Sequence, residues 1–361
     1  MVEKDAKKAR ESNIELLRIL AIMGVIVLHY NNAETGGGGF KYVTENSINE
    51  WVLRFLESTF ICAVNLFVMI TGYFMCITNH RGIKKPLQLI IQVIIFSVAR
   101  YLFSVLSGNK PISVKGLMGA MVPANYFVFL YVTLYFVSPY VNNVLKNLDD
   151  KGRKMFVCTI VVLFSVWPFL VDIFEALSNR DWRGLSTVGA WGNQWGYTIV
   201  NYVMMYIIGA HFRYRDIGKA ENPLLKPGYL ILCLFALAMI ATGLSKANEN
   251  IAWEYCSPIV VAEVVAVFAL FSRIRMKEKK IVNRMARAAF SVYLLHVSFV
   301  RRIGTEKFVT ENVLVMLSHL ALSTIAIYCI CWGVSEIYDK LIGIVYRKLS
   351  KIDELSWDVF M

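Results

Sequence analysis

The sequence predicts an all-α, polytopic integral membrane protein with about ten transmembrane helices and both termini in the cytoplasm. Of its 361 residues, 57% are hydrophobic and only 18% are charged, and the mean hydropathy is +0.52. Soluble chains are about 45–50% apolar and about 25% charged, so this composition excludes an ordinary soluble domain. Lipid forces backbone polar groups to pair within each segment, which favours helices.

Ten apolar stretches approach the length of about 20 residues that a helix needs to cross a bilayer core. They lie at about 14–31, 54–77, 86–106, 126–145, 155–175, 196–212, 228–245, 254–272, 288–303 and 312–338. The ninth stretch is short, and polar residues interrupt the sixth. We therefore expect one membrane domain over residues 1–361, with a cytoplasmic N-terminal segment at 1–13 and a cytoplasmic tail at 340–361.

The basic residues indicate the orientation of these spans. The chain has 38 lysines and arginines against 26 acids, a formal net charge of +12. With the N-terminus inside, 26 of the 38 fall in cytoplasmic segments and 9 in outer loops. This asymmetry follows the positive-inside rule and supports an even number of spans. Because most of the positive charge is explained by topology, nucleic-acid binding has little support.

Three sequence features resemble known signals, but none of them predicts a binding site or a cleavage site in this chain. The seven cysteines lie within or at the ends of apolar stretches without zinc spacing, so we expect neither a metal site nor a disulfide framework. The run Gly36–Gly39 lacks the flanking strand and helix of a phosphate loop and is predicted to be a flexible loop. The first apolar stretch resembles a signal peptide, but no small-residue cleavage site follows it, so we expect an uncleaved helix.

Polar residues in the first span are the strongest candidates for a functional site. Glu15 and Arg18 are three residues apart and can pair on one helix face. His29 comes eleven residues later, which places it within about 20° of the same face and about 16 Å further along the axis. A charge near the bilayer centre costs at least about 2.5–3.5 kcal/mol. Arg18 or His29 alone is better explained by snorkelling or a carbonyl contact, but the stripe favours function.

Other polar residues within predicted spans need partners or a role. Asn65 in the second span needs a hydrogen-bond partner from another helix. Glu263 in the eighth span is expected either to handle protons or to pair with a buried arginine such as Arg100. His296 is placed in the outer half of the ninth span, five residues after Ser291.

A basic cluster at the cytoplasmic surface and a deeper histidine together indicate a chemistry. Arg18, with Arg81 and Lys84 at the same predicted depth, suits a phosphorylated donor. By charge alone, the positive-inside rule explains Arg81 and Lys84 equally well. Coenzyme A has a phosphate-rich head and a long arm that ends in a thioester, and a neutral imidazole can accept a hydroxyl proton at physiological pH.

The pattern therefore predicts an acyltransferase that uses acyl-CoA as a co-substrate and holds no permanently bound cofactor and no metal. The sequence contains no G-x-S-x-G motif. Direct transfer to the acceptor is thus favoured over an acyl-serine intermediate, and an acyl-histidine intermediate remains an alternative.

Four motifs make the sequence resemble the membrane acyltransferase-3 family over nearly its whole length. The most specific is the first-helix pattern of an acid, an arginine and a histidine, matched by Glu15, Arg18 and His29. The others are listed in chain order: Phe67-Val-Met-Ile-Thr-Gly-Tyr73, with Thr71 in the place of serine; Tyr126-Phe-Val-Phe-Leu-Tyr-Val-Thr-Leu-Tyr135, with Pro139; and Ser291, Tyr293, Leu294 and His296.

One motif departs from the family pattern. Many members carry Arg-x-x-Arg after the second helix, where this chain has Arg81-Gly-Ile-Lys84. The charge is kept but one guanidinium fork is lost, and an ammonium group does not reproduce its bidentate contacts.

The resemblance implies a function and a location. Family members O-acylate surface polysaccharides and related cell-envelope molecules, so we expect a multi-pass protein of the bacterial cytoplasmic membrane, embedded in the lipid bilayer. Its donor would be acetyl-CoA, with succinyl-CoA as the alternative, and its acceptor an envelope glycan or a lipid-linked molecule. The transferred group would be an acyl group other than an aminoacyl group.

Nine residues are assigned roles on these grounds. We expect catalysis by His29, Arg18 and Glu15, and donor binding by Arg18, Arg81 and Lys84. We expect Tyr73, Glu263, Ser291 and His296 to contact the substrate or to support residues that do.

Two other function classes remain possible from the sequence. Buried Glu263, His29 and His296 would suit a proton-coupled transporter or flippase of an envelope glycan intermediate. A carrier site should centre near the bilayer midplane, however, whereas Glu15 and Arg18 lie near one surface. The second class is a sensor that keeps the fold without catalysis. The presence of both Arg18 and His29 argues against it, because a sensor would not need them.

Overall fold

The computed structural model describes residues 11–182, 184–189, 191–218, 222–348 and 356–357, and these are almost entirely helical. The one β-pairing among them joins Arg81–Gly82 (β1) antiparallel to Ser356–Trp357 (β2). The predicted all-helical fold is therefore confirmed. Residues 1–10 of the predicted N-terminal segment, and most of the predicted tail beyond residue 348, lie outside the described residues.

The helices follow one another with short connections. In chain order they are α1 (Ser12–Asn31), α2 (Gly39–Tyr42), α3 (Ile48–Phe60), α4 (Ala63–Met75), α5 (Lys84–Leu106), α6 (Val114–Met121), α7 (Tyr126–Asn147), α8 (Asp150–Val161), α9 (Trp167–Ser178), α10 (Ile199–Tyr214), α11 (Pro227–Ala247), α12 (Glu249–Trp253), α13 (Pro258–Ser272), α14 (Lys280–Arg287), α15 (Ala289–Val300) and α16 (Val313–Lys348). Short turns of other helix types lie at Val162–Val166 (π), and at Gln194–Gly196, Pro223–Leu225 and Thr305–Lys307 (3₁₀).

Eight helical segments of the described chain are long and apolar enough to cross a bilayer. They are Ser12–Asn31, Ile48–Met75, Lys84–Leu106, Val114–Asn147, Asp150–Ser178, Pro227–Ala247, Glu249–Ser272 and Val313–Gly343. Each of the ten predicted spans coincides with helix, but the sixth and ninth form α10, with 16 residues, and α15, with 12. Both are shorter than the bilayer needs, so the multi-pass class is supported while the predicted number is not reached.

Two of the long segments are interrupted where the chain changes direction or register. The second predicted span is divided between α3 and α4, which are separated at residues 61–62. The fifth contains the π turn Val162–Val166, directly before α9. Pro168 has no N–H to bond the carbonyl of Phe164, four residues earlier, so the regular α pattern cannot continue through this point.

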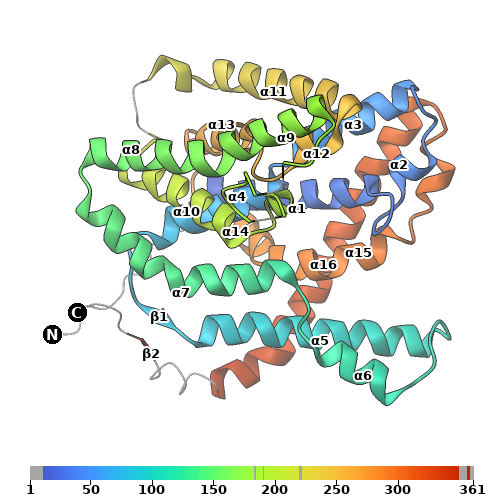
Figure 1. Ribbon diagram of the computed structural model, residues 1–361. Helices are drawn as coiled ribbons and strands as arrows, with labels where there is room; N and C mark the ends of the chain where they lie inside the picture. The colour runs from blue at the N-terminus through green and yellow to red at the C-terminus, as the bar shows by residue number, and fades with distance from the viewer. Residues whose placement is uncertain (1–10, 183, 190, 219–221, 349–355, 358–361) are drawn as a thin grey trace.

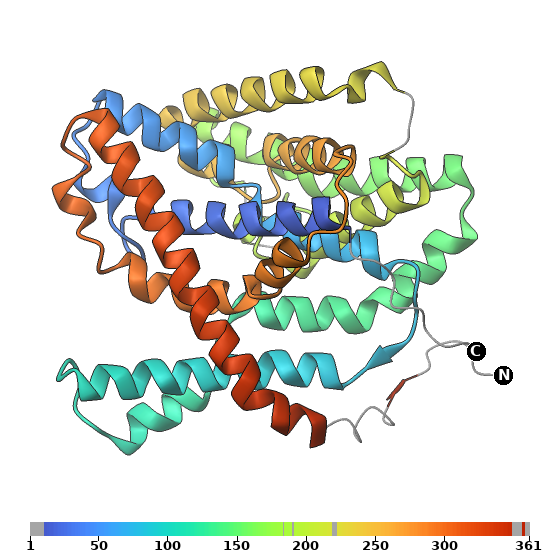
Figure 2. The ribbon, with the colours of Figure 1, turned by 180° about the vertical axis from the view of Figure 1, so that it is seen from behind.

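The first helix lies in the interior of the bundle. In both views α1 is surrounded by other helices, while α11 lies along one edge and α5 with α6 along the opposite edge (Figure 1, Figure 2). Helices α3, α4, α13, α14, α15 and α16 pack against it. Fourteen of its twenty residues are buried, so α1 is enclosed by protein and shares little surface with lipid.

A tight crossing of α4 and α10 supports one side of α1. A Cβ atom added at Gly72 would lie 2.1 Å from the backbone oxygen of Tyr206, and one added at Gly209 would lie 2.1 Å from that of Met69. Small residues let membrane helices approach this closely. Nearby, Asn65 donates to the Tyr255 carbonyl oxygen at 2.7 Å. Asn201 on α10 donates to the Asn65 amide oxygen at 3.0 Å, so the predicted need of Asn65 for a hydrogen-bond partner from another helix is confirmed.

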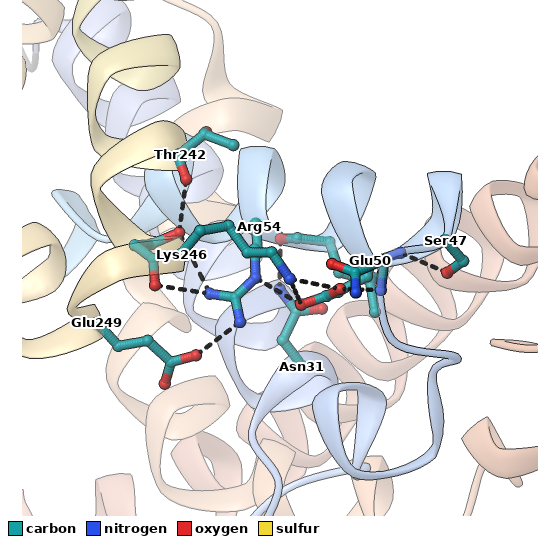
Figure 3. Close-up of polar contacts among 10 residues, drawn as sticks. Asn31, Ser47, Glu50, Arg54, Thr242, Lys246 and Glu249 are labelled. Carbon is teal, nitrogen blue, oxygen red and sulfur yellow. Dashed lines mark hydrogen bonds and ion pairs between the residues drawn. The ribbon is translucent and has the colours of Figure 1, made fainter.

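An ion-pair network ties the helices together at the end of the bundle where α1 finishes. Arg54 pairs with Glu50 at 2.8 Å and with Glu249 at 3.0 Å. Lys246 pairs with the same Glu50 at 2.9 Å. These contacts join α3 to α11 and to the start of α12 (Figure 3).

We expect Gly72→Ala to destabilise the protein, because the new methyl group would meet the backbone of α10 and the two helices would have to separate. Overpacking of this kind costs about 1–3 kcal/mol. Thermal unfolding of the detergent-purified protein, followed by size-exclusion chromatography, measures the loss. Gly243→Ala on α11 is the matched control, since among the described atoms none lies within 4 Å of its added Cβ. Equal melting temperatures for the two variants would contradict the close crossing.

Candidate functional site

A cavity of about 320 Å³ opens beside α1, at the end of the bundle where α1 begins. We call it the basic cavity. It is lined by Arg18, Val25, Val64, Phe67, Thr71, Lys85, Leu89, Phe127, Val128, Tyr131, Ala286, Arg287, Ala289, Phe290 and Tyr293. Arg18, Lys85 and Arg287 carry positive charge, and the described lining contains no acid. The rest of the lining is mainly apolar and aromatic. The cavity thus combines a cationic entrance with a hydrophobic interior.

Arg18 is held in place by its neighbour on the same helix. One nitrogen of its guanidinium group contacts both carboxylate oxygens of Glu15, at 3.1 and 3.2 Å. Its side chain keeps 29% of its surface exposed and lies over the ring of Phe74, 5.5 Å from the centroid. The predicted pairing of Glu15 with Arg18 is therefore confirmed, and part of the guanidinium group remains accessible to a ligand in the cavity.

Two histidines meet at the other end of α1. The ring centroids of His29 on α1 and His296 on α15 are 4.8 Å apart. His296 is buried, and its Nδ1 donates to the Val292 carbonyl oxygen at 3.0 Å, which leaves Nε2 as the nitrogen with a lone pair. Among the described atoms, neither His296 Nε2 nor His29 Nδ1 has a hydrogen-bond partner. Each of the two buried rings therefore has one nitrogen that no described protein atom satisfies.

The histidine pair lies one helical turn beyond the floor of the basic cavity. Val25 lines the cavity and precedes His29 by four residues on α1, so the two share a face about 6 Å apart along the axis. Tyr293 lines it too and precedes His296 by three residues on α15, with 6.2 Å between the ring centroids. The cavity thus leads from Arg18 toward His29.

A second hollow approaches His29 from the opposite end of the bundle. It is a groove formed by three adjoining cavities of about 630, 280 and 240 Å³, which share lining residues such as Glu254 and Trp191. Asn32, three residues after His29, lines the part nearest to α1. His29 therefore lies between Val25 in the basic cavity and Asn32 in the groove.

The glycine run holds the end of α1 that carries His29. Gly37 donates its backbone N–H to the His29 carbonyl oxygen at 2.8 Å, and a Cβ at Gly36 would lie 1.8 Å from that oxygen. Only a glycine backbone can approach so closely. The predicted loop is thus present, and it packs against the helix end beside the histidine.

The family model for an acyltransferase domain matches residues 11–336, nearly the whole chain. The chain belongs to the acyltransferase-3 family. Comparison with curated proteins and with solved structures found no match. Together with the apolar helices, family membership makes the chain a multi-pass membrane acyltransferase.

Arg81 and Lys84 lie close to the acyltransferase's basic cavity but, among the described residues, outside its lining. Arg81 is 2% exposed and gives its N–H groups to Tyr135 O, Ser138 Oγ, Thr78 Oγ1, His80 O and Met75 O. Such a guanidinium group joins the loop after α4 to α7 and has little capacity left for a donor molecule. Lys85 and Arg287 line the cavity instead, and neither is among the residues that the sequence predicted to bind the donor.

The remaining candidates lie at varied distances from the two hollows. Tyr73 packs under Arg213, 4.9 Å from its ring centroid, while Thr71 of the same motif lines the basic cavity. Ser291 is bonded to Ser335 and Gln92, both at 2.8 Å, and so ties α15 to α16 and α5. These contacts give Tyr73 and Ser291 structural roles in the present arrangement.

Glu263 is buried on α13 with neither carboxylate oxygen bonded to any described group. Arg100, the pairing partner considered for it, is exposed on α5 and donates to Ser97. The alternative of a Glu263–Arg100 pair is therefore wrong, because the Glu263 side chain lies in the interior and the Arg100 side chain lies at the surface. The proton-handling alternative for Glu263 stays a prediction.

We expect Arg81→Gln to act on stability, since it removes a buried group that satisfies five acceptors. Buried groups left without partners cost at least about 1–3 kcal/mol in the free energy of unfolding. The melting temperature in detergent should fall clearly, whereas Lys146→Gln, an exposed cation on the same side of the bundle, should leave it unchanged. Normal stability with a raised KM for the donor would instead return Arg81 to the donor site.

Proposed function

We propose that this acyltransferase moves an acyl group, acetyl in the first instance, from cytoplasmic acyl-CoA to a hydroxyl group of a cell-envelope glycan on the other side of the membrane. One observation carries the proposal: His29 lies on α1 between a cationic cavity that opens at one end of the bundle and a groove that opens at the other. His29 itself lines neither hollow, and in this proposal donor and acceptor approach its imidazole from opposite sides.

The orientation rests on charge. The end of the bundle where α1 begins carries Arg18, Lys85 and Arg287 around the basic cavity. The described lining of the groove at the other end contains acids such as Asp172 and Glu254 and neither lysine nor arginine. The positive-inside rule assigns the first end to the cytoplasm. In a bacterial cell this membrane would be the cytoplasmic membrane, with the groove facing outward.

The basic cavity has the features that a coenzyme A thioester requires. Phosphate groups would lie at the entrance, where Arg18 offers a guanidinium fork and Lys85 and Arg287 offer further positive charge. From Arg18 to His29 the helix rises about 16 Å, a distance suited to an extended pantetheine arm. Phe127, Tyr131 and Tyr293 would enclose that arm and exclude water.

His29 would act as the general base. The acceptor hydroxyl gives its proton to an unprotonated ring nitrogen of His29, and its oxygen forms the new bond to the thioester carbon. The carbon–sulfur bond then breaks, the electron pair goes to sulfur, and the histidine returns the proton to the coenzyme A thiolate. His296, whose ring centroid is 4.8 Å away, would contact His29 as a neutral ring whose Nε2 keeps its lone pair.

Sealed inside-out vesicles with radiolabelled acetyl-CoA test the proposal. The cytoplasmic side faces the medium, so label should appear on a glycan inside the lumen and depend on this chain. Succinyl-CoA in a parallel experiment identifies the acyl group. Movement of a glycan intermediate without covalent label would favour the transporter and would contradict acyl transfer.

Replacing His29 by alanine should lower the rate of acyl transfer by about 10²–10⁴-fold, the usual contribution of a general base. The amount of protein in the membrane and its melting temperature should stay close to wild type. His80→Ala, which removes an exposed imidazole from a loop, is the control. A properly inserted His29→Ala protein with wild-type rates would rule out this role.

Neutralising two of the three cavity cations, in the double variant Lys85→Gln and Arg287→Gln, should raise the KM for acyl-CoA about tenfold, equivalent to about 1.4 kcal/mol. The value of kcat should change little, because these contacts exist in the ground state and the transition state alike. The effect should shrink at high salt, since both side chains are exposed. Saturation kinetics should show no change for Lys151→Gln with Lys154→Gln, a control pair with the same loss of charge. If both pairs behave alike, the donor head lies elsewhere.

A further inference from the structure

The groove described above, at the Asn31 end of α1, is rich in acidic side chains, and we call it the acidic groove. Its largest part, about 630 Å³, is lined by Asp172, Glu175, Ala176, Trp191, Gly192, Asn193, Gln194, Trp195, Tyr197, Asn248, Asn250, Ile251 and Glu254. The two smaller parts share residues with it at either side, Glu175 and Trp191 on one and Tyr197 and Glu254 on the other. Carboxylates, amides and large aromatic rings therefore line one continuous surface.

Three carboxylates of the groove lack a cationic partner. Among the described residues, no lysine or arginine forms an ion pair with Asp172, Glu175 or Glu254. Glu249, which lines the smaller part of the groove nearest to Asn32, is paired with Arg54 at 3.0 Å in the network of Figure 3. Among the described ion pairs, a basic partner is thus supplied at one edge of the groove and not to Asp172, Glu175 or Glu254.

Asn193 brings two of these carboxylates together. It is 6% exposed, and its amide nitrogen lies 2.8 Å from Asp172 Oδ2 and 2.5 Å from Glu254 Oε2. Its amide oxygen accepts the backbone N–H of Trp195 at 2.9 Å. The two carboxyl groups therefore lie side by side, and a cation placed against their remaining oxygens would be attracted to the pair.

The aromatic rings are held by a strained and firmly anchored backbone. Gln194 and Trp195 have φ angles of +51° and +53°, in the left-handed region that residues with side chains rarely adopt. The Trp195 carbonyl oxygen accepts from Tyr255 N at 3.0 Å, and a Cβ at Gly196 would lie 2.6 Å from Cys256 N. Strain of this kind persists at sites where ligand geometry matters, whereas a tryptophan that merely anchors at the membrane surface does not require it.

Aromatic faces combined with carboxylates recognise ammonium groups. Trp and Tyr rings attract a cation through their negative faces, and the same rings can stack on sugars. A divalent metal fits less well, because the described residues contain no group of three or more His, Cys, Asp or Glu side chains placed to hold one. The chemistry therefore favours an organic cation.

We propose that the acidic groove selects an acceptor with a positive charge, a glycan that bears a protonated amine, and presents one of its hydroxyl groups to His29. The proposal rests on the acyl transfer proposed above. The ammonium group would lie between Asp172 and Glu254, and the sugar rings would run past Trp195 and Tyr197 toward Asn32, the groove residue three positions beyond His29. A neutral, N-acylated glycan of the same length would leave the carboxylates uncompensated.

Binding to purified protein in detergent tests this without any transfer of acyl groups. The probes are a β-linked glucosamine tetrasaccharide and its fully N-acetylated counterpart, compared by isothermal titration calorimetry at low and high salt. We expect the cationic probe to bind at least about tenfold more tightly, equivalent to about 1.4 kcal/mol, with the preference reduced at high salt. Equal binding of the two probes, or no binding of the cationic one, would overturn the proposal.

Variants locate the preference. Glu254→Gln and Glu175→Gln keep a side-chain acceptor for Asn193 and for the Trp182 backbone N–H, respectively, so either protein should fold. Each should weaken binding of the cationic probe several-fold, whereas Glu34→Gln, an exposed acid near the end of α1, should not. If all three variants bind the cationic probe as wild type does, the groove is not its site.

The two proposals fail separately. A preserved preference for the cationic probe without acyl label from acyl-CoA would refute the proposed transfer and keep the cation site. Acyl transfer to neutral and cationic glycans at equal kcat/KM would keep the transferase and refute the selection by charge.

Discussion

Because α1 is enclosed by six other helices, a polar side chain on it can be tolerated only if it finds a partner within the protein or a ligand. Arg18 meets this demand through Glu15, and Ser12 through Asn283 at 2.9 Å. His29 does not meet it at Nδ1. The burial of α1 therefore also leaves one imidazole nitrogen without a partner among the described atoms, on the stretch of α1 between Val25 of one hollow and Asn32 of the other.

The two hollows are matched to opposite charges at opposite ends of this axis. Arg18 and Arg287 favour an anionic ligand at one end, and Asp172 and Glu254 favour a cationic one at the other. Between them lies an aromatic partition in which Phe127 contacts Tyr293 and Tyr126 contacts Tyr197, with ring centroids 5.1 and 4.9 Å apart. These rings meet at tilted and edge-to-face angles and separate the two hollows with apolar surface.

Sequence periodicity was sufficient for the helical class and for the Glu15–Arg18 stripe, because both depend on residues close together in the chain. It could not distinguish the role of Arg81 from that of Lys85, since positive charge at one depth is compatible with both topology and ligand binding. Only the packing shows that the Arg81 guanidinium group donates its hydrogen bonds to backbone carbonyl groups. The acidic groove was missed altogether. Asp172, Asn193 and Glu254 come from three separate segments, and no local pattern links them.

The π turn at Val162–Val166 adds one residue to a helical turn before α9. Everything beyond such an insertion is rotated by about 100° about the helix axis relative to an uninterrupted α-helix. Asp172 and Glu175 face the groove in this rotated register. Deletion of one residue within the π turn would rotate Asp172 and Glu175 away from the groove. The identity of every groove residue would stay the same. The charge of the groove could therefore change through chain length alone, and the lining of the basic cavity would be left as it is.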